Sequence, residues 1–130
     1  IDSSVLIHFE RYDADLSTYI QGREEEEAFL SVISASELLH GVHCAKDKRI
    51  KAKRLAFVEG VLGSLPILDI NVATARSHSQ LWADLARQGK MIGVHDSWLA
   101  ATCLAHGLRL ATSNLREFNR VPGLDVEKWD

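Results

Sequence analysis

The sequence predicts an α/β fold in which a central, mostly parallel β-sheet has helices on both of its faces. Short apolar runs alternate along the chain with longer amphipathic stretches, a pattern typical of repeated strand–helix units. Residues 28–33 read A-F-L-S-V-I, an almost uninterrupted apolar run that indicates an interior parallel strand. With 130 residues, 46% of them hydrophobic, the chain is long enough for one domain and too short for two ordinary ones.

The chain begins at the end of a strand. Only Ile1 precedes Asp2, and a buried strand normally supplies several residues before its turn, so we expect the N-terminal strand to be truncated in this sequence. A polar helical stretch is expected next, reaching about Glu27 and leading into the strand at 28–33.

Two helices are expected after that strand. Ser34 or Ser36 can cap the first of them, because a serine hydroxyl accepts a hydrogen bond from a free backbone N–H at a helix start. The second covers 46–62, where apolar residues recur on one face. A strand at 66–70 then completes this half of the chain.

The second half contains two further helices with clear end signals. Asn71 is expected to cap the first, and Gly89 to stop it. The second is expected to open at His95 or Asp96 and to close at Gly107. Strands are expected at 108–112 and, as a last short one, at 123–126.

Composition excludes several classes of protein. The formal net charge of −3 gives no overall basic field for gripping nucleic acid, so any such contact must come from a local patch. No apolar run approaches the roughly 20 residues that span a bilayer, and we expect a soluble, cytoplasmic protein with no membrane partner. The two cysteines, Cys44 and Cys103, lack C-x-x-C pairing, so we expect buried free thiols rather than a disulfide or a zinc site.

Acidic residues stand at the junctions where predicted strands lead into helices. Taken singly, each has an ordinary explanation: Asp2 as a turn residue, Glu37 as a first-turn residue that satisfies the helix dipole, Asp96 as an N-cap. In an open parallel sheet, however, the carboxyl ends of the strands meet at one edge, where ligands bind. Asp96 also heads a stripe of apolar residues, which turns its carboxylate inward.

Three carboxylates drawn together would repel one another and resist folding unless a cation neutralised them. Oxygen ligands without a His or Cys cluster favour Mg²⁺ or Mn²⁺ over zinc. Such a site can activate water and neutralise a scissile phosphate, so phosphodiester hydrolysis is the natural chemistry.

Three segments match a known family. The opening D-S-S-V-L (2–6) is similar to its D-[ST]-[SN]-x-[LI] motif, and S-A-S-E-L-L-H-G (34–41) is similar to its second acidic motif. Residues 93–129, which begin G-V-H-D-S-W-L-A-A and end L-D-V-E-K-W, resemble its C-terminal half almost without a gap. The chain resembles the PIN-domain ribonucleases and, among them, the VapC-type toxins of bacterial type II toxin–antitoxin systems.

The resemblance implies a single PIN domain over 1–130, a three-layer α/β/α fold, and a metal-dependent endoribonuclease that cleaves structured RNA, tRNA or rRNA, to inhibit translation. It implies that Asp2, Glu37 and Asp96 hold Mg²⁺ or Mn²⁺. Ser4 and Thr112 fall where small hydroxyl residues support the metal ligands. It also implies a homodimer and a VapB-like antitoxin partner.

The family's fourth acidic position is occupied by Asn114, with Glu117 one helical turn later in an N-x-x-[DE]-F pattern. Which of the two completes the site stays open, and Glu117 is assigned an outer catalytic place. His95 and Arg116 are candidates for RNA contact. Asn114 also keeps a second reading open, in which the chain is an inactive PIN module that binds RNA or protein.

Overall fold

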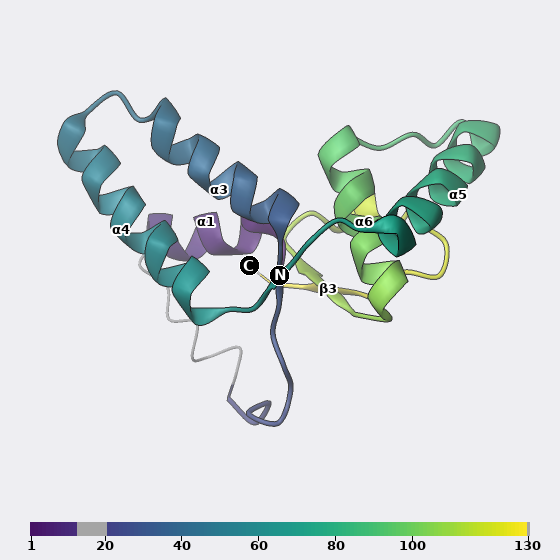
Figure 1. Cartoon of the computed structure of the whole chain (residues 1–130), viewed down its shortest axis with the longest axis horizontal. Coiled ribbons are helices and arrows are strands. Elements are labelled where there is room, and N and C mark those ends of the chain that lie inside the picture. The colour runs from purple at the N-terminus through teal and green to yellow at the C-terminus, as the bar shows by residue number, and fades with distance from the viewer. Residues whose placement is uncertain (13–20, 130) are drawn as a thin grey trace.

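A computed structural model describes residues 1–12 and 21–129 of the chain. Figure 1 shows two groups of helices separated by short strands. The helices are α1 (Ser3–Tyr12), α3 (Val32–Cys44), α4 (Lys48–Ser64), α5 (Val72–Gln88), α6 (Val94–His106) and α7 (Leu115–Phe118), and the strands are β1 (Leu30–Ser31), β2 (Ile67–Leu68), β3 (Leu110–Thr112) and β4 (Val126–Lys128).

The strands form two parallel pairs, β1 with β2 and β3 with β4. The first two residues of the chain lie between these pairs. The backbone nitrogen of Ile1 donates to the carbonyl of Phe29, just before β1, at 2.9 Å, and that of Asp2 donates to the carbonyl of Ala111 in β3 at 2.8 Å. Residues 1 and 2 are not part of a strand in this structure, so the strand expected to end at Asp2 is not observed, but these two bonds hold Asp2 beside β3.

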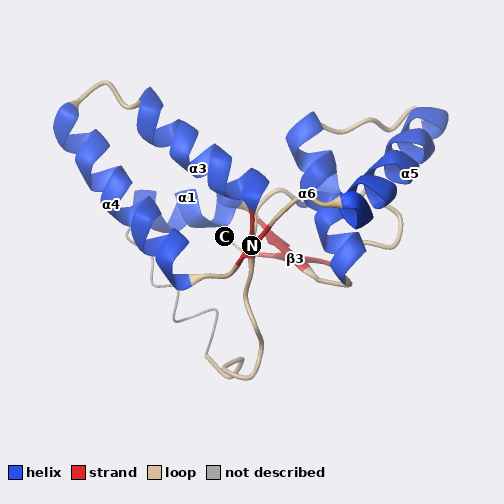
Figure 2. Ribbon diagram, viewed as in Figure 1, coloured by secondary structure: helices blue, strands red, loops and turns tan. Residues whose placement is uncertain are grey.

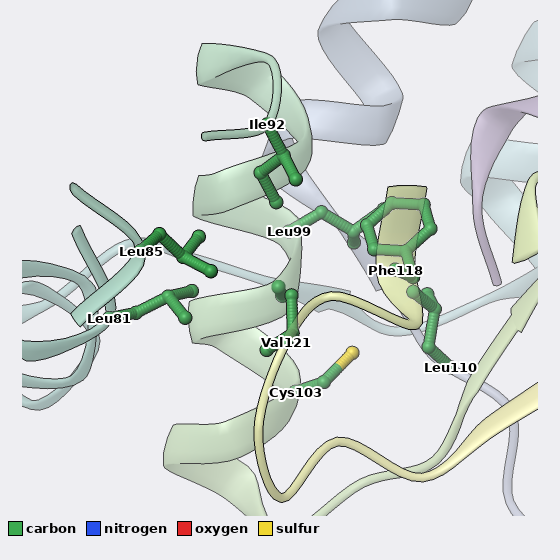
Figure 3. Packing of buried hydrophobic residues seen from close by; sticks show 9 residues of the cluster. Leu81, Leu85, Ile92, Leu99, Cys103, Leu110, Phe118 and Val121 are labelled. Atoms are coloured by element: carbon green, nitrogen blue, oxygen red, sulfur yellow. The ribbon is translucent and has the colours of Figure 1, made fainter. Parts of the chain in front are cut away.

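Each group of helices packs on its own side of the strands (Figure 2). On one side, α1, α3 and α4 bury a cluster that includes Leu6, Leu30, Leu38 and Val58. On the other, α5, α6 and α7 pack around Phe118, with the core residues shown in Figure 3. This arrangement confirms the predicted α/β class with helices on both faces of parallel strands.

Helix α3 begins earlier than expected, so the strand before it is short. The hydroxyl of Ser31 accepts a hydrogen bond from the backbone nitrogen of Ser34 at 3.0 Å and caps the helix. The predictions of a strand over 28–33 and of a cap at Ser34 or Ser36 were therefore wrong at this boundary, because local capping outweighs the apolar character of residues 32 and 33.

Other boundaries also differ from expectation. Helix α1 ends at Tyr12, and residues 21–27 form turns rather than the predicted helix; the intervening 13–20 lie outside the described residues. The last strand covers 126–128 instead of 123–126. The predicted ends of α5 are confirmed: Asn71 forms a capping box with Thr74, and Gly89 ends the helix at φ 64°.

The two cysteines are free, as expected, but only Cys103 is buried. Cys44 is exposed because it is the last residue of α3, where the chain turns toward α4, and its Sγ lies 3.4 Å from Nε2 of His40. Among the described residues, no helix is both long enough and apolar enough to cross a membrane.

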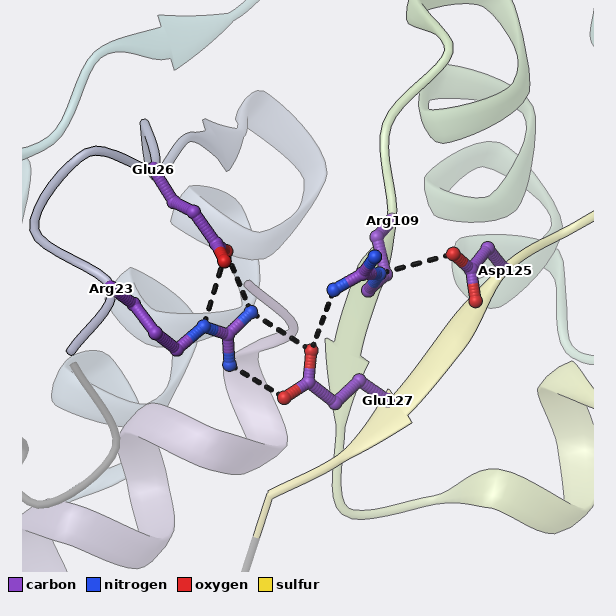
Figure 4. Close-up of polar contacts among 5 residues, drawn as sticks. All are labelled: Arg23, Glu26, Arg109, Asp125 and Glu127. Carbon is purple, nitrogen blue, oxygen red and sulfur yellow. Dashed lines mark hydrogen bonds and ion pairs between the residues drawn. The ribbon is translucent and has the colours of Figure 1, made fainter. Parts of the chain in front are cut away.

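A group of oppositely charged residues ties the 21–27 turn to the strands. Figure 4 shows this paired cluster, defined as Arg23, Glu26, Arg109, Asp125 and Glu127. The guanidinium of Arg23 contacts Glu127 at 2.5 Å and Glu26 at 2.7 Å, and that of Arg109 contacts Asp125 at 3.0 Å. Arg109 precedes β3 and Asp125 precedes β4, so the cluster lies toward the amino ends of these strands.

Candidate active site

Asp2 is held rigidly at the carboxyl end of β3. Its side chain is only 5% exposed, and its Oδ2 accepts hydrogen bonds from Thr112 Oγ1 at 2.7 Å and from Ser4 Oγ at 2.8 Å. The two hydroxyls lie 3.4 Å apart, and Ser4 Oγ also accepts from the backbone nitrogen of Ser113 at 3.2 Å. The predicted supporting residues Ser4 and Thr112 therefore fix one oxygen of Asp2.

Glu37 joins this group from α3. The hydroxyl of Ser3 lies 3.5 Å from Asp2 Oδ1 and 3.3 Å from Glu37 Oε1, and so connects the two carboxylates. Because α3 starts at Val32, Glu37 occupies its second turn and not the expected first turn. The helix dipole acts mainly within the first turn and so does not account for this half-buried glutamate.

Asp96 comes from the first turn of α6. The N-cap of α6 is Gly93, so Asp96 is neither the cap nor the first residue of the helix. The stripe that follows it, Leu99, Ala100 and Cys103, is buried as predicted. Asp96 stands in the first turn, where the helix dipole stabilises a negative charge, but the dipole does not explain its burial next to other carboxylates.

The carboxylates act on one another electrostatically. Burial and, to a lesser extent, the negative charges of Asp2, Glu37 and Glu117 together raise the pKa of Asp96 to about 6, whereas His95 opposes the shift. Burial and the charge of Asp2 likewise raise the pKa of Glu37. Asp96 is thus within electrostatic range of three other acidic side chains, which come from separate parts of the fold.

These side chains do not form a ready-made set of ligands. Within the part of the chain that the structure describes, no three His, Cys, Asp or Glu side chains are grouped closely enough to hold a metal ion. The structure brings Asp2, Glu37 and Asp96 within electrostatic range of one another.

The other candidate residues surround this group. His95 is 65% exposed, and its Nδ1 lies 3.9 Å from Glu37 Oε2. Asn114 is exposed and contributes its backbone nitrogen, which donates to Thr112 Oγ1 at 3.0 Å. Glu117 is half-buried in α7, and Arg116 beside it is exposed.

The exposed cations at the start of α4 do not form a single face. At about 3.6 residues per turn, these side chains spread around the whole helix: Lys48, Arg49, Lys51, Lys53 and Arg54. Arg54 contacts Glu10 at 3.5 Å and the carbonyl of Gly41 at 3.3 Å. Cations that spread around a helix in this way indicate a solvated helix end and not a single basic face.

Sequence reasoning missed two contacts at this site. It did not identify Ser3 as the link between Asp2 and Glu37, although the D-S-S run was a usable signal. It also gave no role to His78 of α5, which contacts Ser97 beside Asp96 at 3.0 Å. No local pattern marks that second contact, because the two residues meet only after α5 packs on α6.

Comparison with known proteins identifies the family. The model of the PIN-domain family matches residues 1–124. The chain is 36% identical over 126 residues to "Ribonuclease VapC1" of Rickettsia felis, covering 97% of this chain and 92% of that protein. The chain belongs to the PIN-domain family, among its VapC ribonucleases.

Other similar proteins agree with this assignment. The "tRNA(fMet)-specific endonuclease VapC" of Shigella flexneri is 36% identical over 100 residues, covering 77% of this chain and 74% of that protein. A crystal structure of DNA-bound VapBC from Salmonella typhimurium matches with a TM-score of 0.89 at 29% identity, covering 99% of this chain and 96% of that one. The PIN-domain fold, the VapC membership and the ribonuclease assignment predicted from the sequence are thereby confirmed.

Proposed function

We propose that this VapC-family chain is the toxin of a type II toxin–antitoxin system and cleaves structured RNA in the cytoplasm with the help of Mg²⁺ or Mn²⁺. The observation that supports this most is the grouping of the partly buried Asp96 with Asp2, Glu37 and Glu117: burial and these neighbouring charges together raise the pKa of Asp96 to about 6. A protein gains nothing in stability from carboxylates that repel one another, so their grouping indicates a functional role.

In this proposal Asp2, Glu37 and Asp96 are the metal ligands. The donor set consists of carboxylate oxygens, which suits Mg²⁺ or Mn²⁺ and not a softer metal. A divalent cation bound there supplies a water of lowered pKa and neutralises charge on the scissile phosphate. Asp2 is already oriented by the hydroxyls of Ser4 and Thr112, so one ligand oxygen needs little rearrangement.

Glu117 is proposed as the outer acidic residue, since its charge reaches Asp96 and its side chain is half-buried. Asn114 supports the site through its backbone bond to Thr112, because its amide side chain cannot neutralise charge. His95 and Arg116 are exposed next to the carboxylates, where they can contact RNA phosphates.

The substrate proposed here is tRNA or rRNA, and the name of the Shigella flexneri relative supports tRNA. The proposed partner is a VapB-like antitoxin, as in the VapBC complex of Salmonella typhimurium. An Arg or Lys of the antitoxin that reached the carboxylates would compete with the cation through charge-assisted hydrogen bonds. We propose that the chain acts as a homodimer.

A second candidate is an inactive PIN module that binds RNA or protein without cleaving it. Two observations favour it: Asn114 at the fourth acidic position, and the absence of a ready-made metal-binding trio among the described residues.

Cleavage of purified tRNA and rRNA, read by mapping new 5′ ends, separates the two functions. We expect the chain to cut at defined positions with Mg²⁺ or Mn²⁺, and to lose cleavage in EDTA or after Asp96→Asn. Asp84→Asn is the matched control and should cut normally, because Asp84 is a half-buried aspartate on α5 that pairs with Arg87 and not with the site carboxylates. Binding of RNA without any metal-dependent cut would establish the inactive module.

A further inference from the structure

The first turn of α6 bears Asp96 but has no side chain to cap it. The N-cap residue is Gly93, and no side-chain hydrogen bond closes this end of the helix. Ser97 stabilises the turn from within: its backbone nitrogen donates to the carbonyl of Gly93 at 2.9 Å, and its hydroxyl donates to the carbonyl of Val94 at 2.6 Å. The geometry of this turn therefore depends on where Ser97 is held.

His78 of α5 holds Ser97 from outside the helix. Its Nε2 lies 3.0 Å from Ser97 Oγ, and the two residues are only 9% and 7% exposed. The single hydroxyl hydrogen of Ser97 is used on Val94, so His78 must be the donor through Nε2–H. Removing either group leaves a buried polar atom without its hydrogen-bond partner, which lowers the stability of the folded state.

The ring of His78 also stacks on the next residue of α6. The rings of His78 and Trp98 are nearly parallel, at 2° with centroids 3.6 Å apart, and Trp82 lies at a tilt 6.0 Å from the same imidazole. His78 thus contacts two consecutive residues, Ser97 and Trp98, directly after Asp96. Consecutive side chains of a helix leave its axis in directions about 100° apart. Holding Ser97 and Trp98 in place therefore also sets the direction in which the side chain of Asp96 leaves the helix.

We propose that His78 is a positioning residue for Asp96: the His78–Ser97 hydrogen bond and the His78–Trp98 stack set the rotation of the first turn of α6, and with it the direction of the Asp96 carboxylate. This inference rests on the proposed function, in which Asp96 is a metal ligand. His78 itself touches neither metal nor substrate.

Three variants separate the His78–Ser97 hydrogen bond from the His78–Trp98 stack. His78→Phe keeps an aromatic ring for the stack and removes the N–H donor, His78→Gln restores a donor without the ring, and Ser97→Ala removes the hydroxyl. Ser79→Ala is the matched control, because Ser79 also donates its hydroxyl to a carbonyl three residues back, at 2.9 Å, but is exposed on α5.

Two measurements are made on each purified chain: hydrogen–deuterium exchange of residues 93–99, and Mn²⁺ affinity by calorimetry. We expect His78→Phe and Ser97→Ala to speed exchange in 93–99 and to weaken Mn²⁺ binding about tenfold, as loss of a ligand's supporting partner does. His78→Gln should lie nearer to the wild type, and Ser79→Ala should match it in both.

The proposal is overturned if His78→Phe and Ser97→Ala bind Mn²⁺ as tightly as the wild type, even where they melt at a lower temperature. Failure of the proposed function gives a different result, namely no Mn²⁺ binding by the wild type itself. If His78→Phe does not fold, Ser97→Ala provides the same comparison.

Discussion

Two groups of acidic residues in this molecule have opposite electrostatics. In the paired cluster, Arg23 and Arg109 hold the pKa of Glu127 below its usual value, and Arg23 does the same for Glu26. At the carboxyl end of β3, burial and neighbouring negative charge raise the pKa values of Asp96 and Glu37. The difference indicates that the charges of the first group stabilise the fold and those of the second oppose it.

The two groups share the same strands, which makes the comparison informative. Arg109 lies directly before β3, and Thr112, which donates to Asp2, ends it. Basic residues are thus available close to the strands, but among the described residues the only basic side chain that pairs with these carboxylates is the exposed His95, near Glu37. In the described part of the chain, the site carboxylates at the carboxyl end of β3 have no arginine partner, although Arg109 lies at the other end of the same strand.

Neutralising a site carboxylate should have the largest effect. We expect Glu37→Gln to reduce RNA cleavage by at least about 100-fold, because one of the three proposed ligands of the cation is lost, and even the loss of a ligand's supporting partner costs about 10- to 100-fold. Its free energy of unfolding should not fall, since the change also removes a repulsion with Asp2. Cleavage assays and urea denaturation measure the two quantities; unchanged cleavage would place Glu37 outside the site.

Removing a support of Asp2 should have a smaller effect. Thr112→Val deletes the hydroxyl that donates to Asp2 Oδ2 at 2.7 Å, and we expect a loss of cleavage of about tenfold. Thr102→Val is the control, because Thr102 is also buried but bonds only to the carbonyl of Trp98. If both variants lost activity equally, burial of a threonine and not support of Asp2 would be the cause.

The pH dependence of stability should differ between the two groups. Folded Asp96 keeps its proton up to a pH of about 6, whereas its ordinary pKa is 3.8, so the folded state binds more protons in this interval. The contribution of Asp96 to the free energy of unfolding therefore falls as the pH rises from about 4 to about 6.

Melting temperatures measured in EDTA between pH 4 and 8 test this sign. We expect Asp96→Asn to gain stability relative to the wild type across that interval and to keep the gain at pH 7. Glu127 has a lowered pKa, so its stabilisation is present at neutral pH and is lost as the pH falls below its usual value. If the wild type instead melted at a higher temperature than Asp96→Asn, by a margin that grew with pH, this would contradict the repulsion between Asp96 and the other carboxylates.

Breaking the paired cluster should have the smallest effect on activity. Glu127→Gln weakens contacts to Arg23 and Arg109, and we expect the free energy of unfolding to fall by about 1 kcal/mol, as is usual for partly exposed ion pairs. RNA cleavage should remain at the wild-type level. A loss of cleavage comparable to that of Glu37→Gln would remove the distinction between the two groups.

Local chemistry explains which parts of the fold could be predicted from the sequence. The ends of α5 follow from the Asn71 cap and from Gly89, and the buried stripe after Asp96 follows from helical spacing. The electrostatic effect of Asp2 and Glu37 on Asp96 agrees with the argument that the carboxyl ends of parallel strands share an edge.

The parts that could not be predicted depend on tertiary contacts or on competing local signals. The 21–27 turn is fixed by a bond between Arg23 and Glu127, which are 104 residues apart, and no helical pattern contains that information. Ser31 capped α3 within an apolar run that also suited a strand. Cys44 is exposed because α3 ends at this residue. In the sequence, Cys44 lies within a helical pattern, and that pattern did not indicate its exposure.

The most direct test of the central claim is Mn²⁺ binding by calorimetry to three chains: the wild type, Asp96→Asn and Glu127→Gln. If the crowded carboxylates form the cation site, the wild type and Glu127→Gln will bind with similar affinity, and Asp96→Asn will lose most of that affinity. Equal binding by Asp96→Asn and the wild type would contradict the claim.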